Sequence, residues 1–411
     1  MLNGRRGAGY PSSVAEDPTH GLLIISAVAV AAPICAELAK RLRVPSVLFE
    51  LLLGMAIGPS LLNLVHVDAS IHEFATLGLC LLFFVAGYEV EVRAVAGRPI
   101  LTALSAWAIS LALGLVVALL LVATGFAIST LLLGLCCTTT AIGTLLPMLR
   151  DRGLLGTKEG TLLLAAGSVG EFGPIVAITV LVGAHDPTNQ FLVLGLFFAL
   201  VVGLLFLATR HQPPKVVAAL QRQLHSSTQL PIRLVLFFVV AMSALAVRLG
   251  IDLLLGAFAA GMVIRLGITE EQAEGLEPKL DAVGYGFFIP IFFIVSGIGM
   301  DAHFFTTLGA LRIPIFCGLF LVVRGIPALF IYRRDLDRRS RWGFAVLQST
   351  ALPLLVVLTQ IGLDTHTMLP VNASAIVAAG MLSVLAFPLI GFSLITAERA
   401  LVDAGVVAPA S

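Results

Sequence analysis

Apolar stretches long enough to cross a bilayer recur along nearly the whole chain, and this pattern limits the fold more than any other feature. A helix needs about 20 mostly apolar residues to cross the hydrocarbon core. The 411-residue chain is 58% hydrophobic and 12% charged, whereas soluble proteins carry roughly 25% charged residues. We therefore predict an all-α integral membrane protein. The net charge of +1 gives no reason to expect a nucleic-acid partner.

The apolar stretches predict about 13 transmembrane helices. Proline and glycine inside several of them are compatible with membrane helices, because neighbouring helices can satisfy the freed backbone groups. The stretches cover residues 21–39, 44–64, 73–92, 99–123, 127–149, 159–184, 190–209, 231–248, 250–267, 282–300, 311–332, 342–363 and 371–397.

Lysines and arginines in the loops predict the orientation, because these residues accumulate on the cytoplasmic side of membrane proteins. With thirteen spans and an external N-terminal tail (residues 1–20), most of the 25 basic residues fall in cytoplasmic segments. These segments include the loop 210–230 and the C-terminal tail, residues 398–411. We predict a multi-pass protein of a bacterial-type inner (plasma) membrane, with its C-terminus in the cytoplasm.

The two halves of the chain share a pattern. It pairs the second predicted span with the ninth, the third with the tenth and the fifth with the twelfth. This shift of seven is odd, so paired spans cross the membrane in opposite directions, as in the inverted repeats of secondary transporters. We predict a six-plus-one-plus-six arrangement with repeats over 21–184 and 231–397 and a linker helix over 190–209. Leu51–Gly54 matches Leu253–Gly256, Phe83-Phe84 matches Phe292-Phe293, and Thr140-Ala141 matches Thr350-Ala351.

Glu171 lies in the sixth predicted span, roughly 18 Å of helix rise beyond Glu159 at its cytoplasmic end. A charge at the bilayer centre costs at least about 2.5 kcal/mol, so an intramembrane carboxylate is a functional-site hypothesis. Small residues around it, including Ser168, leave room for an ion. We predict that Glu171 binds protons and a monovalent cation, with Ser168 in the same site. The alternative is a structural glutamate neutralised by Arg324.

Two corresponding spans are interrupted by polar residues. The first carries Thr138, Thr139 and Thr140 in its middle. Such hydroxyls can bond a free carbonyl or ligate a cation, and paired interrupted helices indicate a substrate site at the midplane. We predict two discontinuous helices that supply ligands, although ordinary polar contacts between packed helices would give the same pattern. The partner residues in the twelfth span are Gln348, Ser349 and Thr350.

Other charges in the spans are interpreted from their depth. Arg324 lies roughly 13 Å from the cytoplasmic face and is the predicted countercharge, unless its side chain extends to the interface. Glutamates near predicted cytoplasmic ends, where water can solvate them, are given no ion-binding role. They are Glu37, Glu50, Glu89 and Glu91.

Three segments resemble the monovalent cation:proton antiporter family, which contains Kef-type potassium exchangers and bacterial sodium/proton antiporters. Residues 41–62 are similar to its opening signature, Leu82–Glu91 to its LFLAGLELD segment, and Leu249–Gly261 to its LGAFLAG segment. The resemblance implies a core bundle (spans four to six and eleven to thirteen) with two crossed discontinuous helices. It also implies a dimerisation bundle (spans one to three and eight to ten) that forms a homodimer, against which the core moves as an elevator.

The resemblance also gives Glu171 a role. Family members carry an Asp-Asp or Asn-Asp pair where this chain has Gly170 and Glu171, and Arg324 matches the family's basic residue. A site with one carboxylate can exchange one proton for one cation, so we expect electroneutral exchange of Na⁺ or K⁺. No cofactor is expected, and no metal other than the monovalent cation at Glu171.

Other functions remain as alternatives to exchange. A channel-like efflux path would move cations without coupled proton movement. A sensor that does not transport could reuse the fold, because Gly170 breaks the usual pair. The sequence contains neither HExxH nor GxSxG, motifs that place a base or a nucleophile in hydrolases. We therefore predict a transporter and not an enzyme, with membrane lipids as its surroundings.

Overall fold

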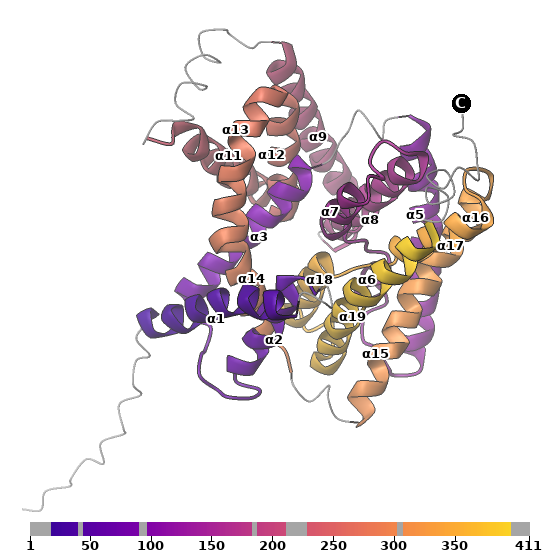
Figure 1. The fold of residues 1–411 in the computed structure, drawn as a ribbon, viewed down its shortest axis with the longest axis horizontal. Helices are drawn as coiled ribbons and strands as arrows, with labels where there is room; N and C mark the ends of the chain where they lie inside the picture. Colours follow the sequence, from indigo (N-terminus) through magenta and orange to yellow (C-terminus); the bar gives the residue numbers. More distant parts are fainter. Residues whose placement is uncertain are drawn as a thin grey trace, which may run out of the picture.

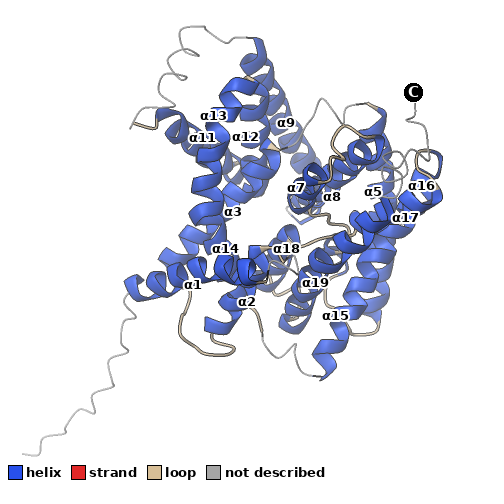
Figure 2. Cartoon of the chain, viewed as in Figure 1, coloured by secondary structure: helices blue, strands red, loops and turns tan. Residues whose placement is uncertain are grey.

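The computed structural model describes residues 18–39, 44–89, 97–182, 187–210, 228–301 and 307–395. Within these ranges every regular element is a helix, as Figure 2 shows. The predicted tails, apart from residues 18–20, and most of the predicted loop 210–230 lie outside the described residues. The prediction of an all-α chain is confirmed for the part of the chain that the structure describes.

The helices follow the predicted spans closely. In chain order they are α1 (Pro18–Leu38), α2 (Ser46–Ile57), α3 (Ala69–Tyr88), α5 (Arg98–Ala123), α6 (Thr130–Cys136), α7 (Ile142–Asp151), α8 (Lys158–Val182), α9 (Pro187–Arg210), α11 (Leu230–Arg248), α12 (Leu253–Gly267), α13 (Glu270–Val283), the π-helical turn η2 (Gly284–Phe288), α14 (Ile289–Ile298), α15 (Thr307–Phe320), the π-helical turn η4 (Leu321–Gly325), α16 (Ile326–Ile331), the 3₁₀ turn η5 (Tyr332–Arg334), α17 (Arg338–Leu347), α18 (Pro353–Asp364) and α19 (Pro370–Ile395).

Eight helical stretches among the described residues are long and apolar enough to cross a membrane. The remaining predicted spans coincide with shorter apolar helices (α2, α9 and α12) and with the interrupted pairs α6/α7 and α17/α18. Both interruptions are confirmed. Residues 137–141 separate α6 from α7, and residues 348–352 separate α17 from α18.

The helices form two bundles (Figure 1). In the first, which we call the α3–α12 bundle, α3 packs on α12 and α14, α14 on α2, and α11 on α12, with α1 against α2. In the second, the crossing bundle, α5 packs on α6 and α8, and α19 packs on α15, α17 and α18. Helix α9 contacts α12 on one side and α8 on the other. The grouping agrees with the predicted core and dimerisation bundles, but dimerisation itself stays a prediction.

Backbones in the α3–α12 bundle approach so closely that only glycine fits. A Cβ atom at Gly87 of α3 would lie 2.1 Å from the carbonyl oxygen of Phe258 in α12. A Cβ atom at Gly297 of α14 would lie 2.3 Å from the carbonyl oxygen of Leu51 in α2. Both contacts join a glycine of one helix to a carbonyl of a helix in the other predicted half of the chain. The inverted repeat itself stays a prediction.

Candidate cation-binding site

The two interruptions, residues 137–141 and 348–352, lie against each other in the crossing bundle, and we call the place where they meet the crossing. The backbone N–H of Ala141 donates a 2.8 Å hydrogen bond to the carbonyl of Thr350. The Thr140 hydroxyl donates a 2.6 Å bond to the carbonyl of Gln348. These bonds join residues more than 200 positions apart and tie one interruption to the other.

Local bonds explain why the helices stop at these positions. The hydroxyls of Thr138 and Thr139 donate to the carbonyls of Leu135 and Cys136, at 2.8 and 3.0 Å. The same two carbonyls, at the end of α6, also accept from the backbone N–H groups of Thr138 and Thr139, at 2.9 and 3.5 Å, in the tighter i→i+3 pattern typical of a helix end. In the second interruption, Pro353 is the first residue of α18, a position where proline is favoured because its missing N–H is not needed.

Glu171 lies in the middle of α8 and faces the start of α7. Its side chain is buried, with 5% of its surface exposed. The carboxylate accepts a hydrogen bond from the backbone N–H of Ile142, the first residue of α7. A helix N-terminus favours an anion, because its free N–H groups and the helix dipole point toward the charge. The tertiary structure thus provides partial compensation for a buried carboxylate.

Three buried oxygens near the crossing have no hydrogen-bond partner among the described residues. They are Oε2 of Glu171, Oε1 of Gln348 and Oγ1 of Thr350. Buried polar atoms are nearly always paired, so each exception calls for an explanation. Gln348 and Thr350 belong to the second interruption, and Glu171 follows Gly170, whose carbonyl accepts from the N–H of Thr140 at 3.2 Å. All three residues therefore belong to segments that are hydrogen-bonded to one another where the two interruptions meet.

Arg324, in η4, ties the crossing to α8. Its side chain is 1% exposed, and its Nε and Nη2 donate to the Thr140 hydroxyl oxygen at 3.1 and 2.6 Å. Nη2 also donates to the carbonyl of Ala166 in α8 at 3.1 Å. No ion pair joins Arg324 to Glu171 in the described part of the chain. The predicted role of countercharge therefore stays a prediction, while the observed contacts of Arg324 are structural.

The space occupied by Arg324 explains the glycine beside Glu171. A Cβ atom at Gly170 would lie 2.6 Å from Arg324 Nη2 and 2.5 Å from the Thr140 hydroxyl oxygen. A family-type Asn or Asp could not occupy this position in the observed arrangement. Sequence reasoning noticed the glycine but had no local signal for the reason, because the residues that fill the space are distant in the chain.

The other predicted ligands are divided between two places. Ser349 is buried and its hydroxyl donates to the carbonyl of Ala345 at 2.8 Å, within the end of α17. Ser168 is half-buried and lines an apolar cavity between α5, α8, α9 and α12. The structure therefore brings Thr138, Thr139 and Thr140 to the crossing with the second interruption, while Ser168 lies in a separate cavity.

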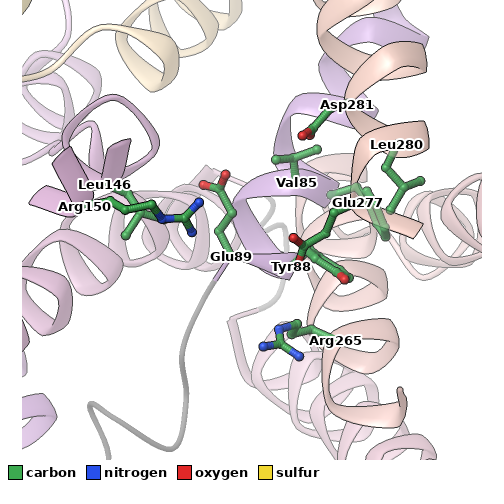
Figure 3. Close-up of a pocket in the computed structure, with 10 residues that line it drawn as sticks. Val85, Tyr88, Glu89, Leu146, Arg150, Arg265, Glu277, Leu280 and Asp281 are labelled. Carbon is green, nitrogen blue, oxygen red and sulfur yellow. The ribbon is translucent and has the colours of Figure 1, made fainter. Parts of the chain in front are cut away.

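A charged cavity separates the two bundles at the end of α3. It has a volume of about 130 Å³, and Figure 3 shows the Glu89 carboxylate from α3 facing Arg150 of α7, with Glu277 and Asp281 of α13 on the opposite wall. The charge of Glu89 interacts with Glu171, and Tyr285 in η2 interacts with Glu89, Asp281 and Glu171. The cavity is thus electrostatically coupled to the buried carboxylate. Sequence reasoning gave Glu89 no role, although the family-like segment 82–91 was a signal.

Glu50 corrects one expectation. We expected water to solvate it near a cytoplasmic end, but the residue is 4% exposed and its Oε2 has no partner among the described residues. Its side chain bonds to Ser46, one turn earlier in α2. The expectation was wrong because depth along a helix does not reveal which face packs against a neighbour.

In the described part of the chain no group of three His, Cys, Asp or Glu residues is arranged to hold a metal ion.

Comparison with known proteins assigns the chain to a family. A family model described as "Sodium/hydrogen exchanger, transmembrane" matches residues 25–397. The chain belongs to this family. Membership confirms the family predicted from the three sequence segments, which is a family of membrane cation/proton antiporters and not of enzymes.

Individual sodium/hydrogen exchanger relatives are distant but match over most of this chain. The chain is 25% identical over 395 residues to YjbQ of Bacillus subtilis, covering 92% of this chain and 63% of YjbQ. It is 28% identical over 392 residues to the glutathione-regulated potassium-efflux system protein KefC of Escherichia coli, covering 90% of this chain and 59% of KefC. The chain thus spans about three fifths of the length of these two relatives.

A solved sodium/hydrogen exchanger structure supports the fold. The sodium proton antiporter MjNhaP1 from Methanocaldococcus jannaschii superposes with a TM-score of 0.61 at 15% sequence identity, over 93% of this chain and 97% of MjNhaP1. At this identity the likeness concerns the fold alone. It confirms a polytopic helical membrane architecture, while the orientation of the termini stays a prediction.

Proposed function

We propose that the chain exchanges Na⁺ or K⁺ for protons, with Glu171 as the carboxylate that binds either ion. The observation that carries the proposal is the buried Glu171 oxygen that has no hydrogen-bond partner in the described structure. An ionised carboxylate can ligate a cation, and a protonated one has lost the charge that attracts it. Because the two bound states exclude each other, movement of one ion depends on release of the other.

Oxygens of the two interruptions would complete the cation's ligand shell. In transporters with discontinuous helices, unwound backbone and helix ends at the midplane coordinate the coupling ion. Thr350 Oγ1 and Gln348 Oε1 are buried and have no hydrogen-bond partner in the described ranges. The hydroxyl oxygens of Thr138 and Thr139 keep lone pairs after donating their protons. Their nearness to the crossing supports a site shared by both halves of the chain.

Alternating access would come from movement of the crossing bundle against the α3–α12 bundle, in the manner of an elevator. The two bundles have separate internal packing, and the charged cavity lies between them. We assign the α3–α12 bundle to a homodimer interface, with the N-terminus outside and the C-terminus cytoplasmic. Arg324 would hold the crossing together while the bundle moves, through its bonds to Thr140 and Ala166.

The first test compares two buried glutamates in vesicles. Cation-induced dequenching of a pH-sensitive dye is measured with the unmodified protein, with Glu171→Gln and with Glu50→Gln, the matched control for a buried carboxylate outside the crossing. We expect Glu171→Gln to lose exchange at least about tenfold, as for removal of an essential ion-binding group, and Glu50→Gln to retain it. Exchange that persists in Glu171→Gln would overturn the assignment.

The same vesicles test the stoichiometry and the alternatives. With one carboxylate and a glycine at position 170, one proton replaces one cation, so exchange should not change when the membrane potential is clamped. Potential-dependent transport would exclude electroneutral exchange. Cation flux without proton movement would favour the channel-like path, and cation binding without flux would favour the sensor.

A further inference from the structure

A large apolar cavity lies between the two bundles, on the side of α8 that carries Phe172. It has a volume of about 560 Å³, within the range of roughly 300–1,000 Å³ that is typical of ligand pockets. Helices α5 and α8 form one wall, with Trp107, Phe172 and Val176. Helices α9 and α12 form the other wall, with Phe198 and Met262.

The cavity is about as long as one leaflet of the bilayer is thick. Along α5 it extends from Ile100, near the start of the helix, to Leu111. Eleven residues of α-helix rise about 16 Å, which is close to half of the roughly 30 Å hydrocarbon core. With the predicted orientation, the start of α5 is cytoplasmic, so the end of the cavity at Ile100 faces the cytoplasm. Along α8 the lining runs from Ser168 past the depth of Glu171 to Ala177.

The side chains that line the cavity favour an apolar ligand. Apart from the hydroxyl of Ser168 and the indole N–H of Trp107, the side chains that line the cavity present hydrocarbon, thioether or aromatic groups. Water is disfavoured in such a space, since a bound water needs two to four polar partners. Leu104 lines the cavity and is 47% exposed, so the edge of the cavity opens where a spanning helix faces lipid tails. Lipid hydrocarbon is therefore the molecule with access to this space.

We propose that this cavity binds one acyl chain of a membrane lipid, inserted lengthwise between the α5/α8 wall and the α9/α12 wall. Two of the lining rings, Phe172 of α8 and Phe258 of α12, are 3.9 Å apart between centroids and join the two walls directly. The bound chain supplies packing between the bundles that side chains do not. This inference depends on the shape and chemistry of the walls and does not require the proposed exchange at Glu171.

Trp107 is a built-in reporter for the acyl chain. It lines the cavity, and its ring is held against α8, because a Cβ atom at Gly173 would lie 2.6 Å from its Cε2. The chain contains two tryptophans, so Trp342→Phe leaves Trp107 as the single emitter. The purified Trp342→Phe protein in detergent is titrated with phosphatidylcholine brominated in its acyl chains, because bromine quenches indole fluorescence on contact. We expect quenching of Trp107 that saturates as for a single site.

Two comparisons separate a bound chain from ordinary surrounding lipid. Ile109→Trp, combined with Trp107→Phe and Trp342→Phe, places the emitter about 3 Å away in depth at a 48% exposed position outside the cavity lining. Its quenching should rise in proportion to the lipid-to-detergent ratio without saturating. Ala177→Leu, which adds bulk inside the cavity, should remove the saturating component from Trp107.

The outcomes decide the proposal. Proportional quenching of Trp107, equal to that of the Ile109→Trp protein, would overturn it, as would saturation that persists in Ala177→Leu. Size-exclusion profile and thermal unfolding verify that Ala177→Leu is folded. If it is not folded, Val176→Phe fills the same cavity from the preceding position of α8 and takes its place.

Discussion

The two bundles differ in the contacts at their centres, although the crossing bundle also has close backbone contacts, such as Gly343 of α17 against the carbonyl of Gly391 in α19. In the α3–α12 bundle, backbone packs directly on backbone, so that Gly87 meets the carbonyl of Phe258 with no space for a methyl group. In the crossing bundle, the centre is held by hydrogen bonds among Thr140, Gln348 and Arg324. The first kind of contact leaves no room for a larger side chain, whereas the second leaves buried oxygens of Glu171, Gln348 and Thr350 without a hydrogen-bond partner among the described residues.

The region between the bundles is less closely packed than either bundle. It contains the charged cavity at Glu89 and the apolar cavity at Trp107. Close packing within each bundle and open space between them indicate where relative movement costs least, because well-packed interiors transmit strain and do not yield gradually. The comparison therefore predicts that substitutions inside a bundle lower the stability of the fold or disrupt the site, while substitutions between the bundles change the movement of one bundle against the other.

The largest stability effect is expected at the hydrogen-bonded centre of the crossing bundle. Thr140→Val keeps the shape but removes the oxygen that accepts two bonds from Arg324. Because Arg324 is buried and charged, the free energy of unfolding should fall by about 3 kcal/mol, the upper value for a hydrogen bond to a charged group. Denaturant unfolding in detergent measures this. Thr140→Ser retains the hydroxyl and should lose much less; equal losses would show that the hydroxyl is not the stabilising group.

A second prediction concerns the backbone contact in the α3–α12 bundle. In Gly87→Ala the new methyl group meets the Phe258 carbonyl at 2.1 Å, so α3 and α12 must separate. We expect the free energy of unfolding to fall by about 2 kcal/mol, as for overpacked cores. Gly195→Ala in α9 is the matched control, since its Cβ would meet nothing within 4 Å, and it should leave stability unchanged. If both variants are equally stable, the bundle is less rigid than its packing implies.

The smallest effect is expected at the N-terminus of α17, away from both centres. Asp337 caps this helix by accepting from the N–H groups of Arg339 and Ser340, at 2.8 and 3.3 Å. Partial burial acts to raise the pKa of Asp337, but the hydrogen bonds outweigh it and lower the pKa below its ordinary value. Asp337→Ala should lower the free energy of unfolding by about 1 kcal/mol, the usual value of an N-cap.

The pH dependence of this cap follows from the sign of the shift. The folded pKa is lower than the unfolded one, so the contribution of the charge is complete above the ordinary pKa of aspartate and is lost as the pH falls through the folded value. Asp337→Asn keeps a capping oxygen but cannot titrate. The stability difference between the native protein and Asp337→Asn, measured by thermal unfolding, should therefore shrink as the pH falls below about 4. A constant difference would contradict the role of the charge.

Much of the architecture could be predicted because it depends on local sequence. The position of each helix follows from runs of apolar residues, and both interruptions follow from polar residues beside glycine or proline, as at Thr138–Thr140 and at Gln348–Pro353. Glu171 was identifiable because a carboxylate inside such a run is costly wherever the helix turns. Each of these properties can be judged within one or two turns of helix.

The rest depends on how distant helices are rotated about their axes and brought into contact. Nothing near Gly170 in the sequence indicates that Arg324 and Thr140 fill the space beside it, because these residues are 154 and 30 positions away. Ser168 and Glu171 lie one turn apart on α8, yet Ser168 lines the apolar cavity and Glu171 faces the start of α7. Glu50 is likewise buried because of the way its helix is rotated against its neighbours. The sequence by itself determined which segments cross the membrane, where two of them break and which carboxylate is exceptional. Only the tertiary structure decided what each of those side chains touches, because helix rotation and packing between remote segments are not encoded in any short stretch of residues.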